Sequence, residues 1–302
     1  MEKQIRARIQ RYWLILPLLS VVFVLDVTAQ IVGIDHIPIA VRNLDEAVRT
    51  YQSLGFAIKE GRPHENGIRN KHIKFPDGTE LELISIDSVG DDLAAEYAAF
   101  AARGEGPAFV ALYASNIDSL SALLADSGIR HLANKRSITF PADHPQRYLF
   151  FGPRQKSPTD RSEHFNHSNG AQTVMGVWLA PAMTASLRKI GRAIGVDLSV
   201  PGVSPHGVGE SRTERLEEGF VRIFSADKQR IPGRPILGVT VRVDNIWNTL
   251  RVLQRVIGSV PTVKVAPAGR SLTLKPEQAH GIWLQFLEVN SSATSNPSAK
   301  MD

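Results

Sequence analysis

The chain contains no cysteine in its 302 residues. This absence excludes structural disulfides, thiolate metal sites and the lipid-modified cysteine of a bacterial lipoprotein. It remains compatible with export to an oxidising compartment, because a chain of this length can be stable without crosslinks. With 43% hydrophobic and 22% charged residues, the sequence has enough apolar material for one large or two ordinary globular domains.

The sequence also lacks any block of like charge. Lysine and arginine total 35 against 30 aspartate and glutamate residues, but they are spread along the chain and are not interleaved with aromatic residues. Such a distribution is typical of solvated protein faces and not of a nucleic-acid groove. We therefore predict no nucleic-acid partner.

Near the N-terminus, the apolar run is too short for a membrane-spanning helix, which needs roughly 20 residues. This run, Trp13–Leu25, follows four basic residues and ends at Asp26. The pattern indicates a secretory signal over residues 1–29 with cleavage after Ala29, and an uncleaved membrane anchor is the alternative. The mature protein is expected to be secreted or periplasmic, with no membrane attachment after cleavage.

Two common catalytic templates are incomplete in this sequence. The segment 202–206 starts like the nucleophile elbow of a serine hydrolase but lacks the closing glycine. Residues 207–209 start like a dinucleotide fingerprint that the following residues do not continue, and no phosphate-binding loop occurs. Neither a serine hydrolase nor a nucleotide cofactor is predicted.

A strand, a helix and a glycine recur four times along the chain. The predicted strands cover residues 34–41, 109–114, 174–180 and 236–243, and the amphipathic helices after them end at Gly55, Gly128, Gly195 and Gly258. Asn43, Asn116 and either Asp244 or Asn245 are suited to cap three of the helices. Each helix is followed by room for several strands, which predicts an internal repeat of a β-α-β-β-β module.

These modules predict an α+β fold in which the helices cover one face of mixed sheets. We expect residues 30–170 and 171–290 to hold one module pair each. Residues 291–302, rich in serine, alanine and asparagine, are expected to form a disordered tail. Polar stretches at 133–170 and 200–235 interrupt the middle modules, and loops of that length are commonly functional or poorly ordered.

Period-two alternation places a histidine and a carboxylate together in the first module. His36 on the first strand and Glu82 on the strand 80–86 both lie on the face away from the helix. They would share this face if the sheet is continuous. A buried imidazole beside a buried carboxylate is costly unless the two are paired or bind a metal ion. The alternatives are thus a metal site and a His–Glu hydrogen bond on an exposed face.

Several short motifs of the first module carry a family resemblance. They are Asp35–Val41, Asn43–Asp45, Leu54–Phe56, His64, Gly67, Asn70, Asp77–Gly78 and Leu81–Ile84. Together they resemble the glyoxalase-like branch of the vicinal oxygen chelate (VOC) superfamily. The resemblance implies that paired modules form open, incomplete barrels whose concave face holds a divalent metal ion, such as Zn, Fe, Mn or Ni. It also implies that His36 and Glu82 are metal ligands and that Glu82 is the catalytic carboxylate.

The other modules depart from this pattern. Aligned by their caps, they place Phe109, Gly176 and Gly238 opposite His36, so no repeat supplies a second histidine at that position. In the fourth module Gln285 aligns with Glu82, and its amide oxygen is a candidate donor to metal or substrate.

The segment 163–170 contains two histidines and is the first candidate source of a further metal ligand. His167 is predicted to be a third metal ligand and His164 to contact substrate, and an ordinary exposed position is the alternative for each. This segment resembles one that lies near the cavity mouth in glyoxalase-like sequences.

Three residues of the turn and strand 64–70 are further substrate-binding candidates. His64, Arg69 and Asn70 are predicted to orient a polar or anionic substrate, and ordinary surface positions are the alternative. His72 has the alternation of Lys74 and is expected to face solvent.

Three functional classes remain open from the sequence. The first is a metal-dependent lyase or isomerase that acts on a small oxygenated substrate, and this is the class we predict. The second is an iron-dependent dioxygenase, which needs a second histidine ligand. The third is a sequestering protein that has kept the cup but lost the metal. The chain is expected to be a monomer or a homodimer.

Overall fold

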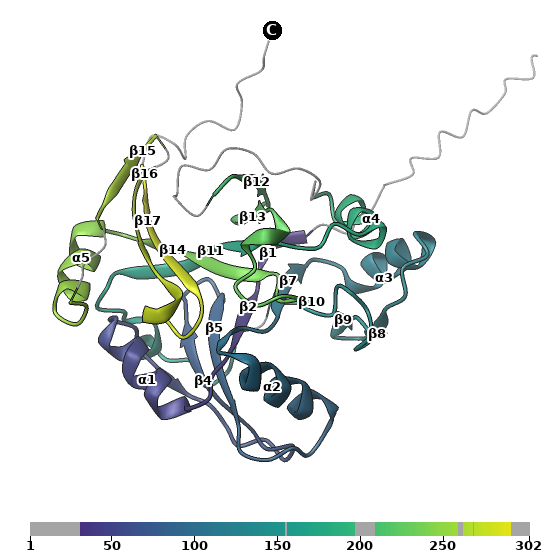
Figure 1. Ribbon diagram of the computed structural model, residues 1–302, viewed down its shortest axis with the longest axis horizontal. Coiled ribbons are helices and arrows are strands. Elements are labelled where there is room, and N and C mark those ends of the chain that lie inside the picture. Colours follow the sequence, from purple (N-terminus) through teal and green to yellow (C-terminus); the bar gives the residue numbers. More distant parts are fainter. Residues whose placement is uncertain (1–30, 155, 197–208, 259–261, 268, 291–302) are drawn as a thin grey trace, which may run out of the picture.

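The computed structural model describes residues 31–154, 156–196, 209–258, 262–267 and 269–290 (Figure 1). The predicted leader over residues 1–29 and the predicted tail over 291–302 lie outside these residues. In the described part of the chain, no helix has the length and apolarity that a bilayer crossing requires.

The first unit contains two five-stranded sheets, in the orders β3-β4-β5-β2-β6 and β1-β7-β10-β9-β8. Asp35 separates β1 (Ile31–Ile34) from β2 (His36–Ala40), and its amide donates to the carbonyl of Ala111 at 2.9 Å. The two sheets therefore continue into one another through a single interrupted strand. The other strands are β3 (Lys59–Glu60), β4 (Ile68–Lys74), β5 (Glu80–Ile86), β6 (Gly106–Pro107), β7 (Val110–Ala114), β8 (Leu132–Asn134), β9 (Ser137–Thr139) and β10 (Leu149–Gly152).

The second unit is one seven-stranded sheet in the order β12-β13-β11-β14-β17-β16-β15. Its strands are β11 (Ala171–Leu179), β12 (Ser211–Arg215), β13 (Phe220–Phe224), β14 (Ile236–Val243), β15 (Lys264–Ala266), β16 (Gly269–Leu274) and β17 (Trp283–Val289). The opening strands β11 and β14 pair antiparallel, and each has the closing strand of its own module parallel to it on its other side. In the first unit the closing strands β5 and β10 likewise lie parallel to the opening strands β2 and β7, but β2 and β7 belong to different sheets, where β2 pairs with β6 and β7 with β1. The predicted α+β fold of repeated modules in open barrels is confirmed.

Four helices occupy the predicted positions: α1 (Leu44–Ser53), α3 (Ile117–Asp126), α4 (Ala185–Ala193) and α5 (Ile246–Gln254). The side chains of Asn43, Asn116, Thr184 and Asn245 each accept a hydrogen bond from an amide in the first turn of the helix that follows. Three short 3-10 helices lie in loops, namely η1 (Ser162–Phe165), η2 (Ala226–Lys228) and η3 (Pro276–Gln278).

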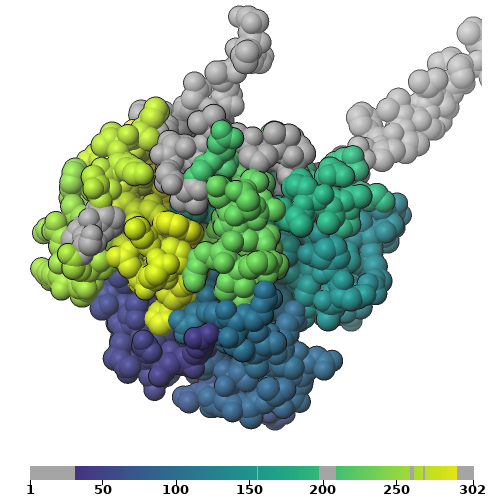
Figure 2. All heavy atoms as spheres, viewed as in Figure 1, coloured from purple at the N-terminus to yellow at the C-terminus, as the bar shows by residue number. Residues whose placement is uncertain are grey.

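The main core lies between the helix-covered faces of the two units. Phe56 after α1 and Phe286 of β17 stack there with ring centroids 5.8 Å apart. Tyr51 of α1 is fully buried and donates its hydroxyl to the carbonyl of Ala279 at 3.3 Å. Figure 2 shows the yellow C-terminal strands directly against the purple N-terminal region. Because the helix-covered faces meet, the concave faces of both units point away from the main core.

A fifth helix, α2 (Asp92–Arg103), was not predicted from the sequence. Its cap, Asp91, accepts from the amide of Ala94, and its interior is rich in alanine, which favours helix. The helix packs on the concave face of the first unit, where Tyr97 joins Ala40, Ile84 and Phe109 in a separate buried cluster (Figure 1). It therefore fills one end of the first cup.

Candidate metal centre

His36 and Glu82 lie on the same concave face, as the alternation predicted. The parallel pairing of β2 with β5 sets His36 beside Glu80 and Pro38 beside Glu82. His36 Nε2 is 4.0 Å from Glu82 Oε2, and the two side chains are only 26% and 16% exposed. An imidazole nitrogen and a carboxylate oxygen at this spacing suit two ligands of one metal ion.

Asp35 holds the imidazole of His36 from the other side. His36 Nδ1 donates to Asp35 Oδ2 at 2.7 Å, so Nε2 is left to face Glu82. A carboxylate behind a histidine is the common way to orient a metal-ligating imidazole. Burial by itself would lower the pKa of His36, but the hydrogen bond and charge of Asp35, with the charges of two glutamates, raise it to about 9. Without a cation in the site, the imidazole of His36 is therefore protonated on both nitrogens and positively charged at neutral pH.

His72 belongs to the same cluster, contrary to the expectation that it faces solvent. The antiparallel pairing of β4 with β5 sets it opposite Glu82, and its Nδ1 contacts the carboxylate of Glu80. One ligand atom from each of His72, Glu80 and Glu82 lies within 4.8 Å of the others. The alternation on β4 was already visible in the sequence. The turn Pro76–Gly78 that fixes the hairpin register could have placed His72 correctly.

Lys74 supplies a positive charge at the edge of this cluster. Its Nζ donates to Glu80 Oε2 at 2.5 Å, and both side chains are largely buried. Burial would raise the pKa of Glu80, but the contact with His72 and the charge of Lys74 lower it to about 2. The negative charge of Glu80 is thus balanced by Lys74 and His72, whereas Glu82 has no lysine or arginine partner among the described residues.

Asn70, a predicted substrate contact, lies next to Glu82. Its Nδ2 donates to Glu82 Oε1 at 2.7 Å, while the other carboxylate oxygen faces His36. Its own Oδ1 accepts from the amide of Arg62 at 3.2 Å, which fixes the orientation of the side-chain amide. Asn70 therefore positions the carboxylate of Glu82.

The two other predicted contacts of the segment 64–70 are Arg69 and His64. Arg69 takes the opposite face of β4, is 52% exposed and sits 3.5 Å from Asp87. His64 precedes the strand, and its Nε2 is enclosed without a partner. In the described chain neither side chain forms a hydrogen bond or ion pair with His36 or Glu82.

The prediction that His167 is a metal ligand is wrong. It is buried in the main core against Phe56 and Phe75. Its Nδ1 accepts from the amide of Ala57 at 2.9 Å, and its Nε2 donates to the carbonyl of Lys74 at 2.9 Å. Both ring nitrogens are thus used by the backbone, and no nitrogen is left for a metal ion. Sequence spacing missed this because it does not say on which side of the sheet a long loop returns.

His164 and Gln285 are also separate from His36. His164 lies in η1, where its Nδ1 accepts from the amide of Arg161 at 3.0 Å. Gln285 is fully buried on the concave face of the second unit and accepts from Thr240 Oγ1 at 2.9 Å. The pairing of Thr240 with Gln285 matches that of Pro38 with Glu82, so the predicted alignment of Gln285 with Glu82 agrees with the strand register.

An open pocket of about 200 Å³ adjoins the cluster. Its lining comprises Asp35, His36, Lys74, Gly78, Glu80, Arg136 and Pro153. The ring of Phe150 on β10 meets the His36 ring edge-on, with centroids 5.2 Å apart. The lining of the pocket is therefore mostly polar and charged. A small oxygenated molecule fits this setting better than an apolar one.

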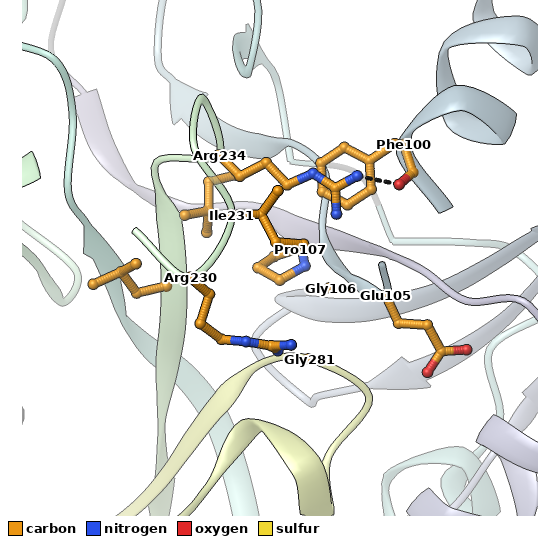
Figure 3. A pocket seen from close by; sticks show the side chains of 10 residues that line it. Phe100, Glu105, Gly106, Pro107, Arg230, Ile231, Arg234 and Gly281 are labelled. Carbon is orange, nitrogen blue, oxygen red and sulfur yellow. Dashed lines mark hydrogen bonds between the residues drawn. The ribbon is translucent and has the colours of Figure 1, made fainter. Parts of the chain in front are cut away.

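A second pocket, shown in Figure 3, lies at the C-terminal end of α2 and holds about 20 Å³. Arg234 lies over the ring of Phe100 and donates to the carbonyls of Phe100 and Gly104. Arg42 donates to the carbonyls of Ala101 and Ala102 in the same helix end. These arginines satisfy free carbonyls and oppose the negative end of the helix dipole. The pocket is thus a helix-docking feature with room for about one water molecule.

The comparisons with known proteins agree with this architecture. The family model described as glyoxalase-like domain matches residues 34–195, which is more than half of the chain. The chain belongs to the glyoxalase-like domain family. It is accordingly a member of the VOC superfamily, as the resemblance of the first module implied. A search of curated proteins finds no match.

Solved structures with the same fold have low sequence identity to this chain. A variant of 4-hydroxymandelate synthase from Streptomyces coelicolor is 11% identical, with a TM-score of 0.57 over 85% of this chain and 92% of that one. A hypothetical protein from Staphylococcus aureus is 12% identical, with a TM-score of 0.54 over 86% and 100% of the two chains. A xylose isomerase-like TIM barrel/4-hydroxyphenylpyruvate dioxygenase fusion protein is 10% identical, with a TM-score of 0.57, over 90% of this chain and 51% of that one. At such identities the likeness concerns the fold alone.

Proposed function

We propose that this glyoxalase-like protein is a divalent-metal-dependent enzyme of the lyase or isomerase type that acts on a small oxygenated substrate. The observation that carries the proposal is the pairing of His36 Nε2 with Glu82 Oε2 at 4.0 Å, with Asp35 bonded behind the imidazole at 2.7 Å. The donor set of imidazole and carboxylate suits Zn, Fe, Mn or Ni. A bound divalent ion would act as a Lewis acid toward substrate oxygens.

His36 and Glu82 would hold the ion, and His72 is the nearest additional donor in the cluster. Asp35 would keep the proton of His36 on Nδ1, which leaves Nε2 free to coordinate. Asn70 would restrain Glu82 through one oxygen. The carboxylate of Glu82 would also accept a proton from the carbon next to a substrate carbonyl.

Lys74 and the open pocket would bind the substrate. Lys74 and Arg136 line the pocket with His36, and these basic groups lie in the same lining as the carboxylates of Asp35 and Glu80. A substrate with adjacent oxygen atoms would place them toward the ligands and any anionic group toward Lys74. Helix α2, with Tyr97, closes the opposite end of the cup against water.

Metal analysis of the purified protein tests the proposal. The chain is supplemented in turn with Zn²⁺, Fe²⁺, Mn²⁺ and Ni²⁺, desalted and analysed by mass spectrometry. We expect about one equivalent of one metal, lost in His36→Ala and Glu82→Gln and retained in the control His164→Ala, whose imidazole lies outside the cluster. A protein that stays free of metal, or binds it equally in all three variants, contradicts the proposal.

Two alternatives are separated by the same measurement. Retention of Fe²⁺ with uptake of O₂ would favour a dioxygenase, the activity that the name of one structural neighbour carries. An empty site would favour a sequestering protein, and the pairing of Glu80 with Lys74 is the observation that supports this candidate, because a protein cation already occupies part of the cluster.

Export is a separate part of the proposal. It is supported by the basic and apolar pattern of residues 1–29, which predicts cleavage after Ala29. N-terminal sequencing of the protein from its native host tests this, and a chain that retains Met1 and remains inside the cell contradicts it.

A further inference from the structure

The concave face of the second unit contains a buried arginine without an acidic partner. Arg222 of β13 is only 6% exposed. Its one hydrogen bond in the described chain is a long one of 3.4 Å to Oε1 of Gln285, and no carboxylate pairs with it. A buried charge without a counter-charge is costly, so an arginine in this state needs an explanation.

Aromatic rings hold the guanidinium of Arg222 in place. Its central carbon lies 5.1 Å from the ring of Trp178 and 5.1 Å from that of Phe220. Trp178 is fixed in turn, because its indole nitrogen donates to Thr240 Oγ1 at 2.9 Å. Arg222, Trp178, Thr240 and Gln285 come from four adjacent strands, so the group spans the middle of the concave face.

Arg222 has N–H groups that form no hydrogen bond with any described residue. None of its nitrogens is among the enclosed, unpartnered side-chain atoms of the described chain. Burial lowers the pKa of Arg222 to about 10, which still leaves the side chain charged at neutral pH. The guanidinium therefore presents unused donors in a fixed orientation.

The concave faces of the two units differ in the side chains at aligned strand positions. In the first unit His36 and Glu82 are the proposed metal ligands, whereas the aligned positions in the second unit are Gly238 and Gln285. Glycine has no ligand atom, and glutamine carries no charge to attract a metal ion. The second cup thus has a buried arginine, whereas the first has the side chains of the proposed metal site.

We propose that the concave face of the second unit binds a small monocarboxylate on Arg222 without a metal ion. A planar guanidinium fork matches a carboxylate with two parallel hydrogen bonds, and one positive charge balances one negative charge. The rings of Trp178 and Phe220 provide the apolar surroundings in which such a charge-assisted bond is strong. This site is independent of the metal centre proposed for the first unit.

Binding to the full chain in the presence of EDTA tests the proposal, with benzoate as the probe and benzamide as its neutral isostere. We expect benzoate to bind with one equivalent by calorimetry and to raise the Tm, and benzamide to bind at least about tenfold more weakly. Arg222→Gln should weaken benzoate at least about tenfold, whereas the exposed control Arg188→Gln and the metal-site variant His36→Ala should leave it unchanged.

Further measurements keep the test decisive. If Arg222→Gln does not fold by circular dichroism, Arg222→Lys keeps the charge but loses the fork, and it should also weaken benzoate. The proposal is overturned if neither benzoate nor acetate binds at up to about 10 mM, if benzamide binds equally, or if the Arg222 variants bind as the parent does. Preference for inorganic phosphate over both carboxylates would overturn the assignment of ligand class.

Discussion

Asp35 Oδ2 lies 2.7 Å from Nδ1 of His36, on the side of the imidazole opposite to the nitrogen that faces Glu82. The two residues are consecutive, and the strand is interrupted at Asp35 between β1 and β2. The interruption lets Asp35 reach back to its neighbour's ring, which regular alternation would direct to the other face. The orientation of His36 therefore depends on a break in the strand.

Asp35→Asn should weaken metal binding. The amide no longer carries the negative charge that favours a proton on Nδ1 of His36, so Nε2 becomes a poorer ligand. We expect a loss of about 10- to 100-fold in affinity by calorimetric titration with Zn²⁺. Asp45→Asn in the first turn of α1, exposed and distant from the pocket lining, is the matched control. An unchanged affinity in Asp35→Asn would show that the carboxylate has no part in the site.

Lys74 and Glu80 should be strongly coupled in stability. Lys74→Met leaves the buried Glu80 carboxylate with only His72 as its close partner, and we expect the free energy of unfolding to fall by about 3 kcal/mol. Adding Glu80→Gln to Lys74→Met should restore part of this loss, because the unpaired charge is removed. Urea unfolding of the two single variants and the double variant measures the coupling. Additive losses would mean that the two side chains do not interact.

His167 should make the fold sensitive to mild acid. Burial lowers its pKa below the ordinary value, although the bond to the Lys74 carbonyl partly opposes this. The unfolded chain therefore takes up this proton first, near pH 6.5, and the free energy of unfolding falls as the pH drops below that value. Below the folded pKa this contribution is fully lost.

The variant His167→Gln tests this assignment. It should cost about 1–3 kcal/mol at pH 7.5, since the amide of Ala57 or the carbonyl of Lys74 loses a well-placed partner. It should also reduce the difference in unfolding free energy between pH 7.5 and 5.5. A variant with the same pH dependence as the parent protein would assign the acid sensitivity to other groups.

The glycines that end the predicted helices should differ in their tolerance to alanine. Gly55 has φ +91°, and a Cβ there would lie 2.9 Å from the backbone nitrogen and the Cβ of Asn169. Gly55→Ala should therefore destabilise the protein by about 1–3 kcal/mol. Gly258, whose φ is not positive and around which a Cβ meets nothing within 4 Å, is the matched control and should be near neutral. Equal thermal stability of the two variants would contradict this account.

The sequence predicted those features correctly that depend on a few neighbouring residues, namely helix caps and the alternation of strand faces. Asn43 and Asn116 were predicted as caps because a cap depends only on the following turn, and both side chains accept the expected amide. His36 and Glu82 were placed on one face because strand alternation has a fixed period, and the distance of 4.0 Å agrees with it. The metal-ligand roles of these two residues stay a prediction.

Three predictions failed, two because a local signal was overlooked and one because the path of a long loop was not known. His72 was expected in solvent, but the concave face is a shared cup and not an open surface. Helix α2 was missed, although Asp91 and the alanine-rich segment after it offered a local signal. His167 was expected near the metal, but its loop returns into the core on the other side of the sheet.

The sequence by itself determined the repeated modules, their capped helices and the face of each strand, since these follow from hydrogen bonds and alternation over a few residues. Only the tertiary structure decided that Lys74 pairs with Glu80, that Arg222 contacts Gln285 across the two strands between them, and that His167 bonds to the backbone. Such contacts depend on sheet curvature and on where long loops return. Both are set by the packing of the whole core, which no short segment encodes.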